Sequence, residues 1–128
     1  MIFRTLTLAA TLVAGSATFA LAEGDAGRGE ALFRRCGVCH QIGEGAENRT
    51  GPVLTGVVGR AAGTAEGFEY SAAFQAKAGE IGAWTTESLA EYIANPARFL
   101  GAAGAMPPQA LRPNQMDDLI AYLATFSQ

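Results

Sequence analysis

The clearest periodic pattern lies near the C-terminus. Four apolar residues there repeat at the spacing of one helical face: Met116, Leu119, Ile120 and Leu123. This segment is therefore predicted to be a helix with one buried side. Pro113 suits its first turn, because the N–H that proline lacks would be unpaired there. Asp117 and Asp118 stand near the positive end of the helix dipole.

Three shorter helices are predicted upstream from capping residues and helix breakers. Their expected ranges are about 26–36, 72–78 and 87–94, with Asp25, Ser71 and either Thr85 or Thr86 as the N-caps. Gly79 is expected to end the second of these helices. Asn95-Pro96 is expected to end the third, because the residue before proline avoids helical dihedral angles.

The segments between these helices carry turn-forming residues and no strand pattern. Residues 41–65 are rich in Gly and Ala around the breaker Gly51-Pro52, and residues 101–108 are Gly, Ala and Pro around a single methionine. The sequence thus predicts an all-α fold of about four to five short helices joined by long loops. Such long loops are reasonable in a small domain when they wrap around a cofactor.

The first 22 residues differ in character from the rest. Arg4 precedes an apolar run over residues 6–14, and Ala20-Leu21-Ala22 follows as a small-x-small cleavage sequence. Residues 1–22 are therefore predicted to be a cleaved signal peptide, and residues 23–128 to form one soluble domain in the periplasm. The run is short for a membrane span, which needs about 20 apolar residues, although retention as an uncleaved anchor stays an alternative.

Charge and composition narrow the function further. The full chain has 9 basic and 12 acidic residues, a net charge of −3, and removal of Arg4 with the signal peptide changes this to −4. No basic run supports binding to nucleic acid. Large aliphatic side chains are few, so the domain would bury a thin core, and a large buried cofactor would complete it.

The strongest chemical signal is Cys36-Gly37-Val38-Cys39-His40. C-x-x-C-H is the attachment pattern of c-type haem, in which two thiols form thioethers with the haem vinyl groups and the adjacent histidine binds the iron. Cys36 and Cys39 are thus the predicted attachment points of one covalent haem c, and His40 is a predicted axial ligand of its iron. A redox disulfide would need a βαβ context, and a zinc site would need a second Cys/His pair, which the chain lacks.

The second axial ligand is predicted to be a methionine, because the chain contains no other histidine. Met116 suits the apolar face of the last helix, where packing accounts for it. Met106 lies between Gly104 and Pro107-Pro108, in a loop where its thioether can approach an iron, and it is the predicted second axial ligand. His/Met ligation is typical of high-potential electron carriers.

These motifs follow one another in an order that resembles the class I c-type cytochromes, the family of mitochondrial cytochrome c and related soluble bacterial electron carriers. The matching stretches between Gly24 and Phe126 are Gly24-Asp25, Gly29, Phe33, the C-x-x-C-H motif, Gly51-Pro52-x-Leu54-x-Gly56, Gly59-Arg60, Gly67-Phe68-x-Tyr70-Ser71, Trp84, Glu91-Tyr92-x-x-Asn95-Pro96 and residues 118–123. The resemblance implies a small cytochrome c fold around one haem. It also implies that Gly29 and Tyr122 form the close contact between the first and last helices.

The resemblance further implies roles in the haem pocket for five residues: Pro52, Arg60, Tyr70, Trp84 and Tyr92. The Pro52 carbonyl would accept a hydrogen bond from the His40 ring and fix its orientation. Arg60, Tyr70 and Trp84 would hold the haem propionates. Tyr92 would lie near the Met106 sulfur.

The chain departs from the family pattern in two places. Residues 101–105, Gly-Ala-Ala-Gly-Ala, replace the usual Pro-Gly-Thr-Lys before the ligand methionine, and the loop from Asn95 is one residue longer. The usual ring of lysines is also missing, since Lys77 is the only lysine. Three arginines, Arg35, Arg49 and Arg98, are predicted to form a small docking patch around the haem edge instead.

The predicted function is that of a monomeric periplasmic electron carrier, not an enzyme. It would take single electrons between respiratory or photosynthetic membrane complexes, periplasmic oxidoreductases, or both. One alternative is a dedicated haem subunit of a dehydrogenase complex. A less favoured alternative is a peroxidase or gas-binding protein, for which no distal histidine is available.

Overall fold

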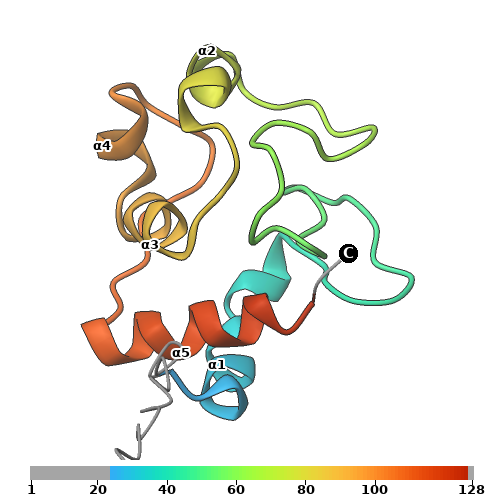
Figure 1. The fold of residues 1–128 in the computed structure, drawn as a ribbon. Coiled ribbons are helices and arrows are strands. Elements are labelled where there is room, and N and C mark those ends of the chain that lie inside the picture. Colours follow the sequence, from blue (N-terminus) through green and yellow to red (C-terminus); the bar gives the residue numbers. More distant parts are fainter. Residues whose placement is uncertain (1–23, 127–128) are drawn as a thin grey trace, which may run out of the picture.

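Helices and long loops make up the chain in a computed structural model that describes residues 24–126 (Figure 1). The helices are α1 (Ala26–Phe33), the 3-10 helix η1 (Cys36–Val38), α2 (Ala72–Ile81), α3 (Thr86–Ala94), α4 (Pro96–Leu100) and α5 (Pro113–Ala124). Between residues 24 and 126 there is no strand, only an isolated bridge of Ala61 with Ala83. The prediction of an all-α fold is confirmed. The predicted signal peptide, residues 1–22, lies outside the described residues.

Helix α1 begins as predicted but ends earlier. The side chain of Asp25 caps it by accepting the Arg28 N–H at 2.8 Å. The predicted end near Cys36 is wrong, because α1 stops at Phe33 and the chain tightens into η1 at the haem motif. Cys39 donates its backbone N–H to the Cys36 carbonyl at 3.0 Å, a turn narrower than an α-helical one.

The helices fall into two groups, one made of α1 and α5 and the other of α2, α3 and α4. The second group is drawn in yellow to orange in Figure 1. Helix α2 runs through Gly79, so its predicted stop there is wrong. It ends at Gly82, whose φ of 66° closes the helix in the left-handed region that glycine tolerates. Helix α3 has the predicted start and end, with Thr85 and Ser88 in a capping box.

Helix α4 was not predicted. Pro96 ends α3 and at the same time occupies the first position of α4, where proline is favoured. The Asn95 side chain accepts the Arg98 N–H at 3.2 Å and so caps α4.

Helices α1 and α5 lie against each other (Figure 1). The contact is close because Gly29 has no side chain: a β-carbon at this position would lie 2.7 Å from Cβ of Tyr122 and closer still to the Asp118 carbonyl oxygen. The Phe33 and Tyr122 rings add a tilted contact with centroids 5.4 Å apart. The contact between Gly29 and Tyr122 that the resemblance implied is therefore present.

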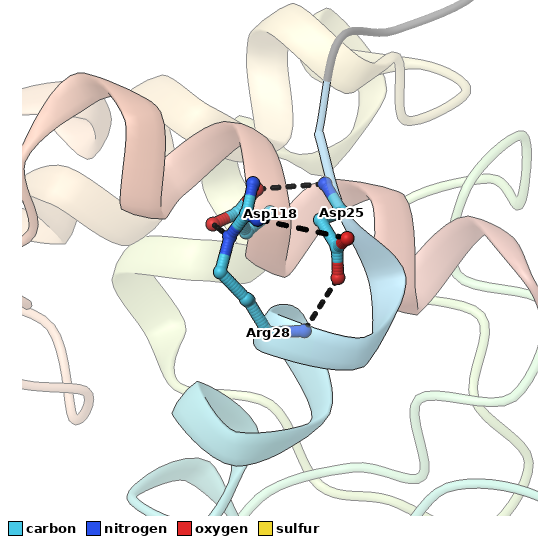
Figure 2. A network of polar contacts seen from close by, with 3 residues as sticks. All are labelled: Asp25, Arg28 and Asp118. Atoms are coloured by element: carbon cyan, nitrogen blue, oxygen red, sulfur yellow. Dashed lines mark hydrogen bonds and ion pairs between the residues drawn. The ribbon is translucent and has the colours of Figure 1, made fainter.

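The buried face of α5 faces the core, as its periodic pattern predicts. Met116, Leu119, Ile120 and Leu123 are all buried. Asp118 is buried as well, because its carboxylate accepts hydrogen bonds from the Asp25 backbone and the Arg28 side chain (Figure 2). Among the helices described, none is both long and apolar enough to cross a membrane.

Candidate functional site

A cavity of about 530 Å³ opens between the two groups of helices. One wall carries the haem motif, with Cys36, Cys39 and His40. The other walls come from residues 50–60, from α2 and α3, from the buried face of α5, and from the segment that contains Met106. Most of the lining is hydrocarbon, so the cavity suits a large, flat, mainly apolar group.

His40 is oriented by the loop that follows the haem motif. Its ring Nδ1 lies 2.7 Å from the Pro52 carbonyl oxygen, and since the carbonyl can only accept, Nδ1 carries the proton. Nε2 is then the unprotonated nitrogen of a neutral imidazole, which is the form that binds metals. Burial lowers the pKa of His40, against the opposing effect of the Pro52 carbonyl, and so favours this neutral form.

Backbone hydrogen bonds fix this loop to the haem motif. Gly51 donates to the Cys39 carbonyl at 2.8 Å, and Leu54 donates to the Gln41 carbonyl at 3.0 Å. The His40 N–H in turn bonds the Cys36 carbonyl at 2.9 Å. The two cysteines and the histidine are thus held on one wall by a single network.

The two cysteines are free and half-buried. Burial raises the pKa of the Cys36 thiol, while the nearby Arg35 opposes that shift. Redox-active C-x-x-C pairs instead depend on a lowered thiol pKa, so the environment of Cys36 does not favour the disulfide alternative. Over residues 24–126, no group of three or more His, Cys, Asp or Glu side chains comes together, whereas a structural zinc site needs four ligands.

The two methionines have different environments. Met106 is half-buried and lines the cavity together with Tyr92 and Ile93 of α3. Met116 is buried in the core face of α5 and is not among the residues that line the cavity. Of these two methionines, only Met106 therefore lines the cavity.

Arg60 brings an unpartnered donor to the cavity. One terminal nitrogen of Arg60 donates to the Thr55 carbonyl at 3.1 Å, but Nε of the same side chain is buried without a hydrogen-bond partner. Burial lowers the pKa of Arg60, against the opposing effect of the nearby Tyr70. A buried donor of this kind calls for an anionic acceptor. Nearby, the Tyr70 hydroxyl accepts the Ala65 N–H at 2.9 Å and keeps its own hydrogen free to donate.

Aromatic rings form much of the cavity lining. Tyr70 stacks on Phe74 at 4.9 Å between centroids, and Trp84 lies 5.4 Å from Tyr92. Of these rings, Phe74 was not predicted as a pocket residue, although it is the one large apolar side chain in α2 apart from Ile81. Gly51 was also missed as a site residue, since its contact with His40 involves no side chain of its own.

The three predicted docking arginines are all exposed, and none lines the cavity. Arg35 and Arg49 are chain neighbours of the lining residues Cys36 and Thr50. Arg98 instead lies on α4 at a separate depression that also contains Lys77.

The cytochrome c family model matches residues 26–127. The chain belongs to the cytochrome c family. It is 46% identical to cytochrome c2 iso-1 of Rhodospirillum centenum over 82% of this chain and 98% of that protein, and 41% identical to cytochrome c2 of Agrobacterium tumefaciens over 79% and 91%. The solved structure of cytochrome c2 from Rhodospirillum centenum superposes with a TM-score of 0.77 at 36% identity, covering 82% of this chain and all of that one.

Family membership confirms the predicted class I cytochrome c fold and the covalent haem c. Cys36 and Cys39 are consistent with the attachment motif of that cofactor. The cavity fits such a group, because it combines an apolar interior, an imidazole with a free Nε2, and an unpartnered arginine donor. As a member of this family, whose relatives include cytochromes c2, the protein is a monohaem electron carrier and not an enzyme.

Proposed function

We propose that this protein is a periplasmic carrier of single electrons whose haem c is attached through thioethers of Cys36 and Cys39. In this proposal His40 and Met106 are the axial ligands of the iron. The observation that carries it is the 2.7 Å contact between His40 Nδ1 and the Pro52 carbonyl. This contact commits one ring nitrogen to the protein and leaves Nε2 directed to a metal, in the arrangement common to metal-binding histidines.

Met106 is proposed as the sixth ligand because it is the cavity-lining methionine. When bound, haem c supplies an iron that alternates between Fe(III) and Fe(II). A neutral thioether together with an imidazole as ligands would favour the reduced state relative to stronger donors, so we expect a high reduction potential. Tyr92, Ile93 and the other apolar lining residues exclude water from the same wall.

Arg60, Tyr70 and Trp84 are proposed to hold the haem propionates. The unpartnered Nε of Arg60 and the free hydroxyl hydrogen of Tyr70 would both gain an acceptor when a carboxylate enters. Charge-assisted hydrogen bonds of this kind offset the cost of burying the charges.

The periplasmic location rests on the signal peptide predicted for residues 1–22, followed by a mature domain from residue 23. Partners are proposed to be membrane oxidoreductases or periplasmic enzymes, and the protein is proposed to be monomeric. Docking would occur at the haem motif, where Val38 is 74% exposed and the charged Arg35, three positions earlier in the chain, is exposed as well. Small, partly apolar contacts suit the short-lived complexes of electron transfer.

The test is an optical spectrum of the mature protein from a periplasmic fraction, with and without reductant. We expect a low-spin haem with a sulfur–iron charge-transfer band, and haem that stays bound in acid-acetone. Cys39→Ala removes one of the two proposed attachment points. It should leave little mature protein, because the apolar core would lack the haem at its centre. A high-spin spectrum would instead favour an open, peroxidase-like site, and constant co-purification with a dehydrogenase would favour the subunit alternative.

A further inference from the structure

Gly51 lies directly against the ring of His40. A β-carbon added to Gly51 would stand 2.7 Å from both ring nitrogens of His40 and closer still to Cε1. Real β-carbons essentially never approach other heavy atoms within 3.0 Å. The position has no positive φ, so backbone conformation does not explain a glycine there. The space that the imidazole ring occupies explains the glycine instead.

Neither partner in this contact can move away freely. The Gly51 N–H donates to the Cys39 carbonyl at 2.8 Å, and the Gly51 carbonyl accepts the Arg49 N–H at 2.9 Å. The next residue, Pro52, receives the His40 Nδ1–H at 2.7 Å. If residue 51 retreats from the ring, it must stretch its bond to Cys39 and carry the Pro52 carbonyl with it.

We infer that Gly51 is a positioning residue for the axial histidine: its missing side chain lets the imidazole lie flat against the loop while Nδ1 reaches Pro52. This inference rests on the proposed role of His40 as an iron ligand. It adds a second constraint to the hydrogen bond, because one contact sets where the ring proton points and the other sets the plane of the ring. A side chain at residue 51 would disturb both.

The contact between Gly51 and His40 should influence the reduction potential of the iron. The Nδ1–H hydrogen bond makes the imidazole a stronger donor, which stabilises Fe(III). A tilted ring with a weakened hydrogen bond is a poorer donor, so the reduction potential should rise. We expect a change of about tenfold in the equilibrium constant for reduction of the iron, which corresponds to about 59 mV for a one-electron couple.

The experiment compares Gly51→Ala with Gly79→Ala in the haem-loaded protein. Gly79 is an exposed position of α2 that does not line the cavity, and a β-carbon there would meet nothing within 4 Å, so it is a control for an added methyl group. We expect Gly51→Ala to raise the reduction potential and to shift the paramagnetic NMR signals of the His40 ring in the ferric protein. Gly79→Ala should change neither. Equal behaviour of the two variants would overturn the inference.

A second measurement uses the wild-type protein alone, so it does not require that Gly51→Ala folds and accumulates. In the reduced wild-type protein, which is diamagnetic when low-spin, NMR should show a nuclear Overhauser contact between a Gly51 α-proton and the ring Hε1 of His40. Absence of that contact would overturn the inference whatever the variant does. Failure of the proposed function is seen separately, since a wild-type spectrum without a low-spin haem contradicts the ligand assignment and not the packing of Gly51 on His40.

Discussion

Asp118 of α5 and Arg28 of α1 are joined by two hydrogen bonds, from Nε to Oδ2 at 2.9 Å and from a terminal nitrogen to Oδ1 at 3.2 Å. The same carboxylate accepts the Asp25 N–H at 2.7 Å (Figure 2). One side chain of the last helix thus bonds a side chain of the first helix and the backbone at that helix's start. The pairing holds together the two ends of the domain.

This pairing predicts a specific acid sensitivity. The Arg28 hydrogen bond and then the Asp25 N–H lower the pKa of Asp118 below its ordinary value of 3.8. The ionised carboxylate therefore stabilises the fold at pH values above 3.8, and this stabilisation is lost as the pH falls further through the lowered pKa. Asp118→Asn should lower the urea midpoint at pH 7 and flatten its decline in acid.

Asp117→Asn is the control for that variant, since it removes the same charge from an exposed neighbour. It should leave the midpoint and its pH dependence close to those of the wild type. If both variants behave alike, the general charge of α5 governs acid stability and the pairing with Arg28 does not.

A second prediction concerns the contact of α1 with α5. Gly29→Ala should destabilise the protein by about 3 kcal/mol, at the upper end of what overpacking usually costs, because the new β-carbon meets the α5 backbone. Urea unfolding with haem absorbance as the signal would measure this. Gly27→Ala adds the same group to an exposed position of the same helix, where the β-carbon would meet only the Asp25 carboxylate, at 3.2 Å, so its effect should be much smaller.

A third prediction tests where α2 ends. Gly79→Ala should stabilise the protein by about 0.5–1 kcal/mol, since Gly79 is an interior, exposed helical position with nothing within 4 Å of a new β-carbon. Gly82→Ala should destabilise it by about 1 kcal/mol or more, because φ there is 66°. Thermal melts of the two variants would show opposite shifts, and the reverse order would place the end of the helix at Gly79.

The end of α2 and the start of α4 show what the sequence could and could not predict. Gly79 and Gly82 are both glycines near a helix end, and the positive φ of Gly82 and its hydrogen bond to the Ala78 carbonyl distinguish the true cap. Helix α4 escapes prediction because Pro96 is a signal both for the end of one helix and for the start of the next.

Much of the cavity lining was predictable because its chemistry is concentrated in short motifs. Spacing and resemblance identify the haem motif and Pro52, and the periodicity of the last helix places Met116 in the core and leaves Met106 as the methionine outside it. The role of Met106 as a ligand stays a prediction. Gly51 could not be identified, because its role is an absence of atoms beside His40. The pairing of Asp118 with Arg28 could not be predicted either, because the two residues lie 90 positions apart in the chain.

A fourth prediction separates the two methionines. Met106→Ala should convert the low-spin haem to a high-spin or water-ligated form and lower its reduction potential, because the ligand pair is a main determinant of that potential. Met116→Leu should leave the spectrum unchanged and cost less than about 1.5 kcal/mol, as a volume-conserving core substitution. Optical titration of both proteins checks this, and the opposite pattern would assign the ligand to Met116.

A fifth prediction concerns docking. Rates of electron transfer with an acidic partner should fall moderately as salt rises, because the field at the docking face guides association. Arg35→Glu should slow association more than Arg98→Glu, since Arg35 precedes the haem motif and Arg98 lies at the depression shared with Lys77. Stopped-flow rates at several ionic strengths measure both effects. Equal slowing by the two variants would mean that net charge alone governs the encounter.

The aromatic wall of the cavity has a further consequence for speed. From Phe68 through Tyr70, Phe74 and Trp84 to Tyr92, successive ring centroids are 4.8 to 6.2 Å apart. Rings packed in this way carry few dipoles that can turn when a charge beside them changes. We therefore expect a small reorganisation energy of the surroundings, because fixed surroundings of this kind need not rearrange at the moment of reaction. A carrier built in this way can exchange an electron with partners whose potentials lie close to its own.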